Sequence, residues 1–540
     1  MSTRKVGIKW LKGWLLVAGI VLAALTDAIA SSVLAIGRND IMGDTHATSD
    51  EFAWLDVAYT ACKLAGFLFA PWLLGRLPPR AVIIGATLAM GLACVGAAQL
   101  VSIELLVALR ACQGLSGGVL LVAGQTLIFL AYPRRQQPVL QGLFAIGAVV
   151  APAALTPSMQ GWLIDSQDWT WIFLSVAPLT LAATGLLLLV ELPAYDLPGR
   201  RRFDWPGWVL AATALLCLTY LLTQGSRWDW FEAAHMCWAG VVGGTALLLL
   251  LGQQLTGNGQ GLLDFSLFRS SDFTFAFIVS FVAGAALFGS AFVIPAFALS
   301  MLGFTATDAG LLLLPSGVVF IAVLLGVAYL IQVRGIAPFA TVPFGILAIM
   351  AAMWMLSGST RESGMHDMMA AVMLRGAGLG LLFLSLTLIA FGRLGRHSLA
   401  SGIGLFNTGR QVGGLLGVAG LQTLLDQHGV LNAQALGAHV STGATAVNER
   451  LDSVTSMLRL EGIDPPAAGR VAMSLLSQAV TGQGAVIAFD TAFIAVALLF
   501  AVAAPLLVCI KMLLARMAGK QDAGQSHEGE LPVSHRELSL

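Results

Sequence analysis

Residues 14–36 read WLLVAGIVLAALTDAIASSVLAI, an apolar stretch that contains one charged residue, Asp27. A helix that crosses a bilayer needs roughly 20 mostly apolar residues. The residues before this stretch are rich in Lys and Arg, as in a signal peptide. Its apolar run is nevertheless longer than the roughly 7–15 residues of a signal sequence. We therefore predict that it is the first spanning helix of a membrane protein.

Composition extends this prediction to the whole chain. Of the 540 residues, 57% are hydrophobic and 11% are charged, against roughly 25% charged residues in soluble proteins. So few charges cannot cover the surface of a soluble protein of this size, and lipid must therefore surround most of it. The formal net charge is zero. We therefore expect no nucleic-acid partner.

Motifs typical of enzymes and cofactor-binding proteins are missing from the sequence. The six Cys have no CxxC or Cys/His spacing that would hold a metal, and their apolar surroundings argue against disulfides. The Gly cluster at 114–118 lacks the Lys-Ser/Thr end of an ATP-binding P-loop. We expect a protein that is not an enzyme, holds no metal or cofactor, and draws energy from an ion gradient.

Hydropathy predicts about fourteen spanning helices. An even number of spans places both termini on the same side of the membrane. The candidate spans begin near Trp14, Phe52, Ala81, Ile103, Pro138 and Thr170, then near 205 and 233, and finally near Phe273, Thr307, Ile336, Asp367, Ser398 and Ala485.

The distribution of Lys and Arg predicts the orientation. If the N-terminus is cytoplasmic, most of the 29 basic residues fall on the cytoplasmic side, as the positive-inside rule requires. The basic clusters on that side are Arg76/Arg80, Arg134/Arg135, Arg200/Arg201/Arg202 and Arg393/Arg396. We therefore predict a multi-pass protein of the plasma membrane, a bacterial inner membrane, with both termini in the cytoplasm.

The spans form two groups of six with a pair between them. Arg110 follows a Leu at the start of the Gly-rich fourth span, and Arg375 does so in the twelfth. Such repeats predict an all-α major facilitator fold of two six-helix bundles plus two extra central helices. The predicted parts are a cytoplasmic N-terminus (1–13), an N-terminal bundle (14–192), a linker with the extra helices (193–271), a C-terminal bundle (272–515) that includes an external loop (426–484), and a disordered cytoplasmic tail (516–540).

Two smaller patterns concern packing and the external loop. Gly409, Gly413 and Gly417 lie four residues apart in the thirteenth span, and small residues at this spacing let helices approach closely in lipid. Within the external loop, residues around 448–460 and 467–480 read as amphipathic helix.

Charged residues inside a bilayer are costly and are candidates for function. The candidates well inside spans are Asp27, Lys63, Arg110, Arg375 and Arg410. A buried carboxylate without a partner is stable mainly in its protonated form, whereas a nearby cation favours the ionised form. Asp27 is therefore a candidate proton switch. The alternative is a static ion pair that locks the first span to its neighbours. Arg110 does not give up its proton, so its role is that of a fixed positive charge.

The sequence leaves alternatives open both for the role of Lys63 and for the polar residues in the thirteenth span. Lys63 either neutralises Asp27 or faces an anionic substrate, unless it reaches out to the membrane interface. Asn407, Arg410 and Gln411 form a polar face of the thirteenth span, or they lie at the interface if that span starts later. We predict a substrate pathway that contains Lys63, Gln113, Arg375, Asn407, Arg410 and Gln411.

These residues also resemble a known family, the fourteen-span drug–proton antiporter branch of the major facilitator superfamily, of the EmrB/QacA type. The resemblance covers nearly the whole chain. It rests on Asp27 in the first span, the basic Arg76 and Arg80 after the second, Arg110, Gln113 and Gly114 in the fourth, Pro152, Pro157 and Gly161 in the fifth, and the aromatic run at 169–173 that enters the sixth.

The chain departs from that family's pattern at several positions. Ser32 stands where Asn is usual, and Thr156 and Gln160 stand where Gly is usual. Lys63 has no counterpart in the pattern, and the loop after the second span keeps only its basic residues.

The resemblance implies a proton-coupled exporter of amphipathic or lipophilic small molecules, in which Asp27 carries the proton and Arg110 tunes it. One alternative is an exporter of an anionic metabolite such as a siderophore or a fatty acid, since cations outnumber Asp27 within the spans. Another is an inner-membrane component of a tripartite assembly with a periplasmic adaptor and an outer-membrane channel, which the loop 426–484 would contact.

Overall fold

The computed structural model describes residues 2–528, apart from 101, 191–202, 257–261, 263 and 441–443. Within these ranges the chain is helical and contains no strand. Thirteen helices are long and apolar enough to cross a membrane. The remaining predicted span, near Ser398, lies in α16 (Arg396–His439). Its many Gly and polar residues lower its hydropathy, yet it packs along α12, α18 and α3 like its neighbours.

The first group of spans forms one bundle, in which α3 and α5 make the most extensive helix contact of the molecule. The predicted fifth span is a composite, with a π-helical segment between two α-helices. The elements are α1 (Ser2–Ile36), α2 (Arg38–Thr45), α3 (Ser49–Leu74), α4 (Pro79–Ala97), α5 (Ile103–Ala131), α6 (Gln137–Ala145), η1 (Ile146–Leu155), α7 (Thr156–Ser166), α8 (Thr170–Leu174) and α9 (Val176–Leu188).

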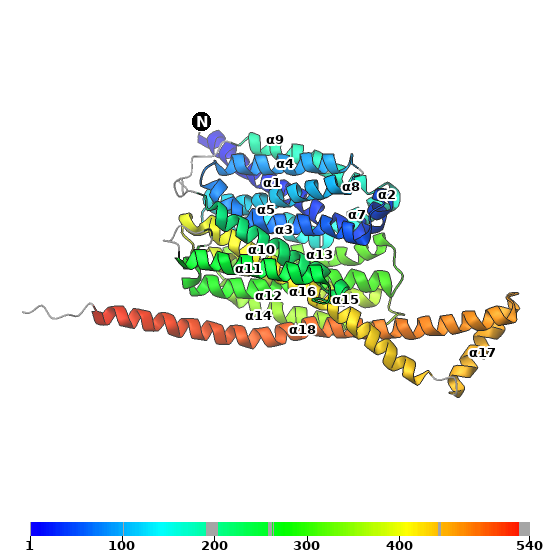
Figure 1. Ribbon diagram of the computed structural model, residues 1–540. Coiled ribbons are helices and arrows are strands. Elements are labelled where there is room, and N and C mark those ends of the chain that lie inside the picture. The colour runs from blue at the N-terminus through cyan, green and yellow to red at the C-terminus, as the bar shows by residue number, and fades with distance from the viewer. Residues whose placement is uncertain are drawn as a thin grey trace, which may run out of the picture.

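The second group repeats this arrangement, with α12 packed on α16 and α13 packed on α15. Figure 1 shows that α1 begins and α18 ends at the same end of the bundle, as an even number of crossings requires. The elements are η3 (Phe265–Arg269), α12 (Ser271–Ser300), α13 (Ala306–Arg334), η4 (Pro338–Ala340), α14 (Val342–Leu356), α15 (Met365–Phe391), α16, α17 (Thr445–Leu460) and α18 (Pro465–Glu528).

The extra pair consists of α10 (Trp205–Gln224) and α11 (Ala234–Thr256), joined through η2 (Ser226–Trp228). These two helices are the least buried of the thirteen spans. The helix α10 packs on α3, where the Trp208 Nε1 donates a hydrogen bond to the Ala65 carbonyl at 3.2 Å. The pair therefore lies on the flank of the N-terminal bundle with most of its surface toward lipid.

Glycines allow the bundle helices to approach one another closely. A Cβ atom on Gly114 would lie 2.0 Å from the Tyr59 carbonyl oxygen, and one on Gly413 would lie 2.1 Å from that of Phe281. Gly417 meets the Ala285 backbone in the same way, and Gly409 packs closely against the Phe277 ring. The predicted small-residue packing of the thirteenth span is confirmed.

Two seams join the halves. Along one, α13 packs against α6, η1 and α7, and the Ser158 Oγ donates a hydrogen bond to the Gly310 carbonyl at 2.7 Å. Along the other, α16 packs against α3 and α5. There, a Cβ atom on Gly404 would lie 2.4 Å from the Phe67 carbonyl oxygen.

A helical hairpin, here called the distal hairpin, comprises the described residues of 426–484. It contains the end of α16, the helix α17 and the start of α18. It projects from the end of the bundle opposite the start of α1 (Figure 1). The predicted amphipathic helices of the loop therefore form. The tail predicted from 516 to be disordered is instead helical in α18 as far as Glu528, where Arg, Met, Ala, Lys and Gln residues favour helix. Residues 529–540 lie outside the described residues.

Candidate functional site: a buried ion pair and its neighbouring cations

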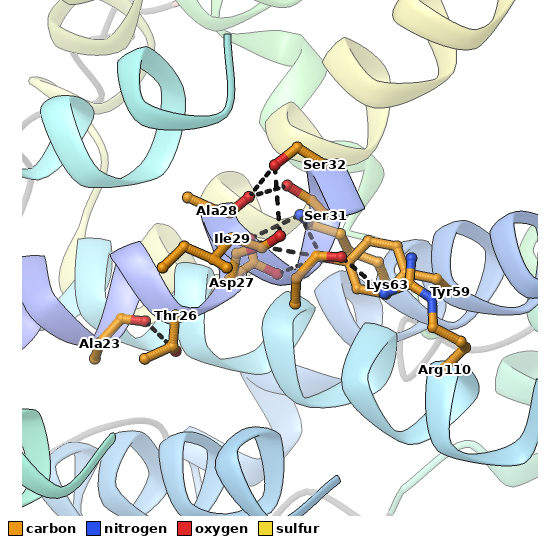
Figure 2. Close-up of polar contacts among 11 residues, drawn as sticks. Ala23, Thr26, Asp27, Ala28, Ile29, Ser31, Ser32, Tyr59, Lys63 and Arg110 are labelled. Carbon is orange, nitrogen blue, oxygen red and sulfur yellow. Dashed lines mark hydrogen bonds and ion pairs between the residues drawn. The ribbon is translucent and has the colours of Figure 1, made fainter. Parts of the chain in front are cut away.

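Asp27 lies in the second half of α1 and is 1% exposed. Lys63 of α3, 7% exposed, places its Nζ 2.7 Å from the Asp27 Oδ2. The Tyr59 hydroxyl donates a hydrogen bond to the Asp27 Oδ1 at 2.7 Å. Tyr59 and Lys63 are one helical turn apart, so both side chains project from the same face of α3. Figure 2 shows both side chains extending from α3 toward Asp27.

The site is closed on its α5 side by Gly117. A Cβ atom on this residue would lie 2.0 Å from the Asp27 Oδ1. The absence of a side chain therefore makes room for the carboxylate between α1 and α5. A third helix thus contacts the ion pair, and movement of α5 relative to α1 would change the surroundings of Asp27.

Arg110 is buried beside this pair but does not contact Asp27. Its Nη1 donates hydrogen bonds to the Ala30 carbonyl at 2.7 Å and to the Gln113 Oε1 at 2.9 Å. Its guanidinium lies over the Tyr59 ring, 4.2 Å from the centroid, as Figure 2 shows. The Gln113 Nε2 in turn donates to the Ala93 carbonyl at 3.2 Å. Arg110 thus holds α1 and α5 together and influences Asp27 through Tyr59.

The geometry identifies Lys63, rather than Arg110, as the cation that faces Asp27. Lys63 is buried and bonded within the bundle and does not extend to the interface. Tyr59 is the site residue that sequence reasoning missed. Its position four residues before Lys63 was the available signal, since two polar groups at this spacing in an apolar helix share a face.

The residues that depart from the antiporter pattern form hydrogen bonds between the first and fifth spans. The Ser32 and Thr156 hydroxyl groups lie 2.7 Å apart, between α1 and α7. The Gln160 Nε2 donates a hydrogen bond to the Ile29 carbonyl at 2.9 Å. Polar side chains that replace the usual Gly residues therefore bind the fifth span to the first within two turns of Asp27.

The motif residues of the second and fifth spans have structural positions. Pro152 lies inside the π-helical η1, Pro157 lies in the first turn of α7, and Gly161 is buried. The Arg76 guanidinium lies 4.9 Å from the Trp72 ring centroid. Arg80 donates a hydrogen bond to the Leu188 carbonyl at 2.7 Å. None of the five contacts the Asp27 pair.

Arg375 lies in the C-terminal bundle and is as buried as Arg110, at 1% exposure. Its Nε donates to the Ser290 hydroxyl at 2.7 Å. Weaker contacts join it to the Ser316 hydroxyl at 3.4 Å and to the Leu287 carbonyl at 3.5 Å. Its partners in the described chain are all uncharged.

The predicted polar face of the thirteenth span lies well within α16, because that helix already begins at Arg396. The Asn407 Nδ2 donates a hydrogen bond across the halves to the Gln125 Oε1 at 3.3 Å. The Gln125 Nε2 donates to the Gln141 Oε1 at the same distance. Arg410 is partly buried, with its guanidinium 4.8 Å from the Phe383 ring centroid. Gln411 is partly buried as well.

The site residues thus form two separate groups. Asp27, Lys63, Arg110 and Gln113 lie together in the N-terminal bundle, and Arg375, Asn407 and Arg410 lie on α15 and α16 of the C-terminal bundle. No group of three or more His, Cys, Asp or Glu residues in the described chain could hold a metal ion.

Comparisons with known proteins agree with this architecture. The family model for the Major Facilitator Superfamily matches residues 16–418. The chain is 24% identical to the multidrug export protein EmrB of Escherichia coli K12, over 87% of this chain and 90% of that protein. It is 22% identical to the fatty acid resistance protein FarB of Neisseria gonorrhoeae, over 90% and 93%.

Among solved structures, the human organic anion transporter MFSD10 (TETRAN) matches with a TM-score of 0.54 at 10% identity. The match covers 90% of this chain and 99% of that one. At this identity the likeness concerns the fold alone.

Proposed function

The chain belongs to the major facilitator superfamily, and on this basis we propose that it is a proton-coupled exporter of amphipathic small molecules. Its two bundles would rock about a central site to expose it alternately to the two sides of the membrane. The observation that carries the proposal is the Asp27–Lys63 pair. Among the described residues, Asp27 is the one carboxylate that is buried. The multidrug export of the EmrB relative supports the direction of transport.

The chemistry of the pair suits proton coupling. With Lys63 at 2.7 Å and the Tyr59 hydroxyl on its other oxygen, Asp27 is stabilised as a carboxylate. A proton that reaches Asp27 removes the ion pair and releases Lys63. Because the contacts of Asp27 involve α1, α3 and α5, the proton loaded from one side would weaken contacts among these helices. Their rearrangement would then favour release of the proton on the other side.

The experiment measures proton-gradient-driven uptake in everted membrane vesicles, with a panel of lipophilic cations and organic anions. Asp27→Asn is expected to abolish gradient-driven uptake of every transported member. The matched control is Asp272→Asn, which removes a partly buried carboxylate at the start of α12 whose Oδ2 lies 2.7 Å from the exposed Arg393 and should leave uptake unchanged. Gradient-driven uptake that persists in Asp27→Asn at normal expression would contradict the proposal.

We also propose that the start of α1 and the end of α18 are cytoplasmic in a bacterial inner membrane. The distal hairpin would then face the periplasm, where it could contact an adaptor protein of an export assembly that reaches an outer-membrane channel. Its α17 has exposed apolar residues, Met457 and Leu460, which supports a protein contact. Labelling of cysteines introduced at Met457 by a membrane-impermeant maleimide in intact cells tests the orientation. Unchanged export after deletion of residues 445–460 would contradict the docking role.

A further inference from the structure

A small cavity lies in the C-terminal bundle between α12, α15 and α16. Arg410 lines it together with the hydroxyl residues Ser280 and Thr387. The rest of its wall is apolar and includes Leu379, Phe383 and Phe406. The cavity has a volume of about 10 Å³, enough for about one water molecule. We propose that, when the helices around it rearrange during transport, it opens into the subsite for the head group of an amphipathic carboxylate, with Arg410 as the residue that binds the carboxylate. The proposal rests on the proposed export function and names the substrate class.

The first argument is that Arg410 differs from the other buried cations. Lys63 pairs with Asp27, and both Arg110 and Arg375 donate hydrogen bonds to neutral groups around them. Arg410 has neither an ion pair nor a side-chain hydrogen bond among the described residues. Its guanidinium instead lies over the Phe383 ring, 4.8 Å from the ring centroid. A guanidinium carries five N–H donors in a planar fork, and an unmatched one inside a membrane protein is costly. A ligand carboxylate can accept two of these donors at once.

The second argument concerns the shape of the ligand. Leucine and phenylalanine side chains around Arg410 favour an apolar tail over a small hydrated anion. Ser280 provides a hydroxyl group that can donate to the head group, whereas the Thr387 hydroxyl donates its single proton to the Phe383 carbonyl at 3.0 Å. One strong cation in an otherwise apolar wall fits a molecule with one anionic head and a hydrophobic body.

The third argument links the cavity to the seam between the halves. Asn407 lies three residues before Arg410 and therefore on the same side of α16. Asn407 donates the hydrogen bond that reaches Gln125 of the N-terminal bundle. A carboxylate on Arg410 thus binds within one helical turn of a contact between the bundles. Binding there can influence which arrangement of the two halves is favoured.

The test is equilibrium binding to the purified full-length protein in nanodiscs, with radiolabelled dodecanoate as the probe and empty nanodiscs as background. Dodecyltrimethylammonium and dodecanol, of equal chain length, serve as cationic and neutral competitors. We expect saturable binding of dodecanoate that neither competitor displaces effectively. Arg410→Gln should weaken it by about tenfold or more, since a charge-assisted hydrogen bond contributes roughly 1.5–3 kcal/mol. Arg410→Lys should restore part of the affinity.

Two further variants keep the test decisive. Arg393→Gln removes an exposed arginine, and should bind dodecanoate like the wild type. Leu379→Trp fills the cavity while it leaves Arg410 in place, and should weaken binding even if Arg410→Gln does not fold. Unchanged affinity in Arg410→Gln, or displacement of dodecanoate by the cationic competitor as readily as by unlabelled dodecanoate, would overturn the subsite. Because no gradient is applied, binding can succeed when Asp27→Asn shows that proton coupling is wrong, and the two failures are distinguishable.

Discussion

Arg110 and Arg375 are buried arginines of corresponding helices of the two bundles, α5 and α15, but their surroundings differ. Near Arg110 there is a complete ion pair, Asp27 with Lys63, and Tyr59 connects the three charges. Near Arg375 there are two serine hydroxyl groups and a carbonyl, but no carboxylate contacts it. The same fold repeat thus places an ion pair with a carboxylate beside the buried arginine in one half, whereas the buried arginine of the other half contacts neutral groups alone among the described residues.

This difference suggests that the N-terminal bundle couples transport to protons and the C-terminal bundle binds the substrate. A group that gains and loses a proton must be a carboxylate here, and the N-terminal bundle holds the buried one. An anionic cargo requires a cation with free donors, and Arg410 of the C-terminal bundle has them. The seam formed by Asn407 and Gln125 joins the two regions. Three sets of variants can break or sharpen this comparison.

The largest effect is expected for Lys63→Met. This change leaves Asp27 buried without its cation, and loss of one partner of a buried ion pair costs about 3–5 kcal/mol of stability. Protonation of Asp27 would offset part of this cost. We expect a lower thermal unfolding midpoint in detergent and no gradient-driven uptake in vesicles.

The double variant Asp27→Asn with Lys63→Met separates a proton switch from a static lock. It removes both charges, so the unfolding midpoint should return most of the way toward the wild-type value. If the pair were only a lock, gradient-driven uptake would return as well. Uptake that stays absent in a stable double variant supports the switch.

The intermediate effect compares Arg110→Met with Arg375→Met. Arg110→Met removes the 2.7 Å bond that joins α5 to the Ala30 carbonyl of α1 and the 2.9 Å bond to Gln113 within α5, and it leaves the Ala30 carbonyl without this donor. Each buried polar group that loses its partner costs roughly 1–3 kcal/mol. Two of the three Arg375 contacts are long, at 3.4 and 3.5 Å. We therefore expect the larger fall in unfolding midpoint and in uptake for Arg110→Met. Equal losses would mean that the two buried arginines contribute equally to stability and to transport.

The sequence predicted the architecture well because it depends on apolar length, and every predicted span lies in a helix of the structure. Most predicted starts fall within a few residues of a helix start, but Trp14 and Ala485 lie inside the longer helices α1 and α18, which begin at Ser2 and Pro465. Burial of Asp27 and Arg110 followed from their place in apolar runs. The pairing of Lys63 with Asp27 could not be chosen over that of Arg110, because the rotation of α3 about its axis is set by its close packing on Gly114 and Gly118 of α5. Packing of this kind is a property of three helices together and has no local pattern in any one of them.

The contact between the halves was beyond sequence reasoning for a similar reason. Asn407 was predicted to lie on a polar face, but Gln125, 282 positions away in the chain, had no feature that identified it as the partner. The fifth span also gave no sign of its π-helical segment beyond Pro152, although wide turns of this kind occur frequently at functional sites.

The smallest effect is expected at the seam between the bundles. Asn407→Leu removes a hydrogen bond of 3.3 Å to Gln125, which keeps its contact with Gln141. A neutral hydrogen bond contributes about 0.5–1.5 kcal/mol, so the unfolding midpoint should fall only slightly. A double-mutant cycle of Asn407→Leu and Gln125→Leu should give a coupling energy of roughly 0.5 kcal/mol or more. The cycle of Asn407→Leu with Gln141→Leu, which share no direct contact, is the matched control. A coupling that is no larger in the first cycle than in the second would mean that the two bundles meet at this seam without a specific polar link, and that ligand binding near Arg410 must reach the proton site by another route.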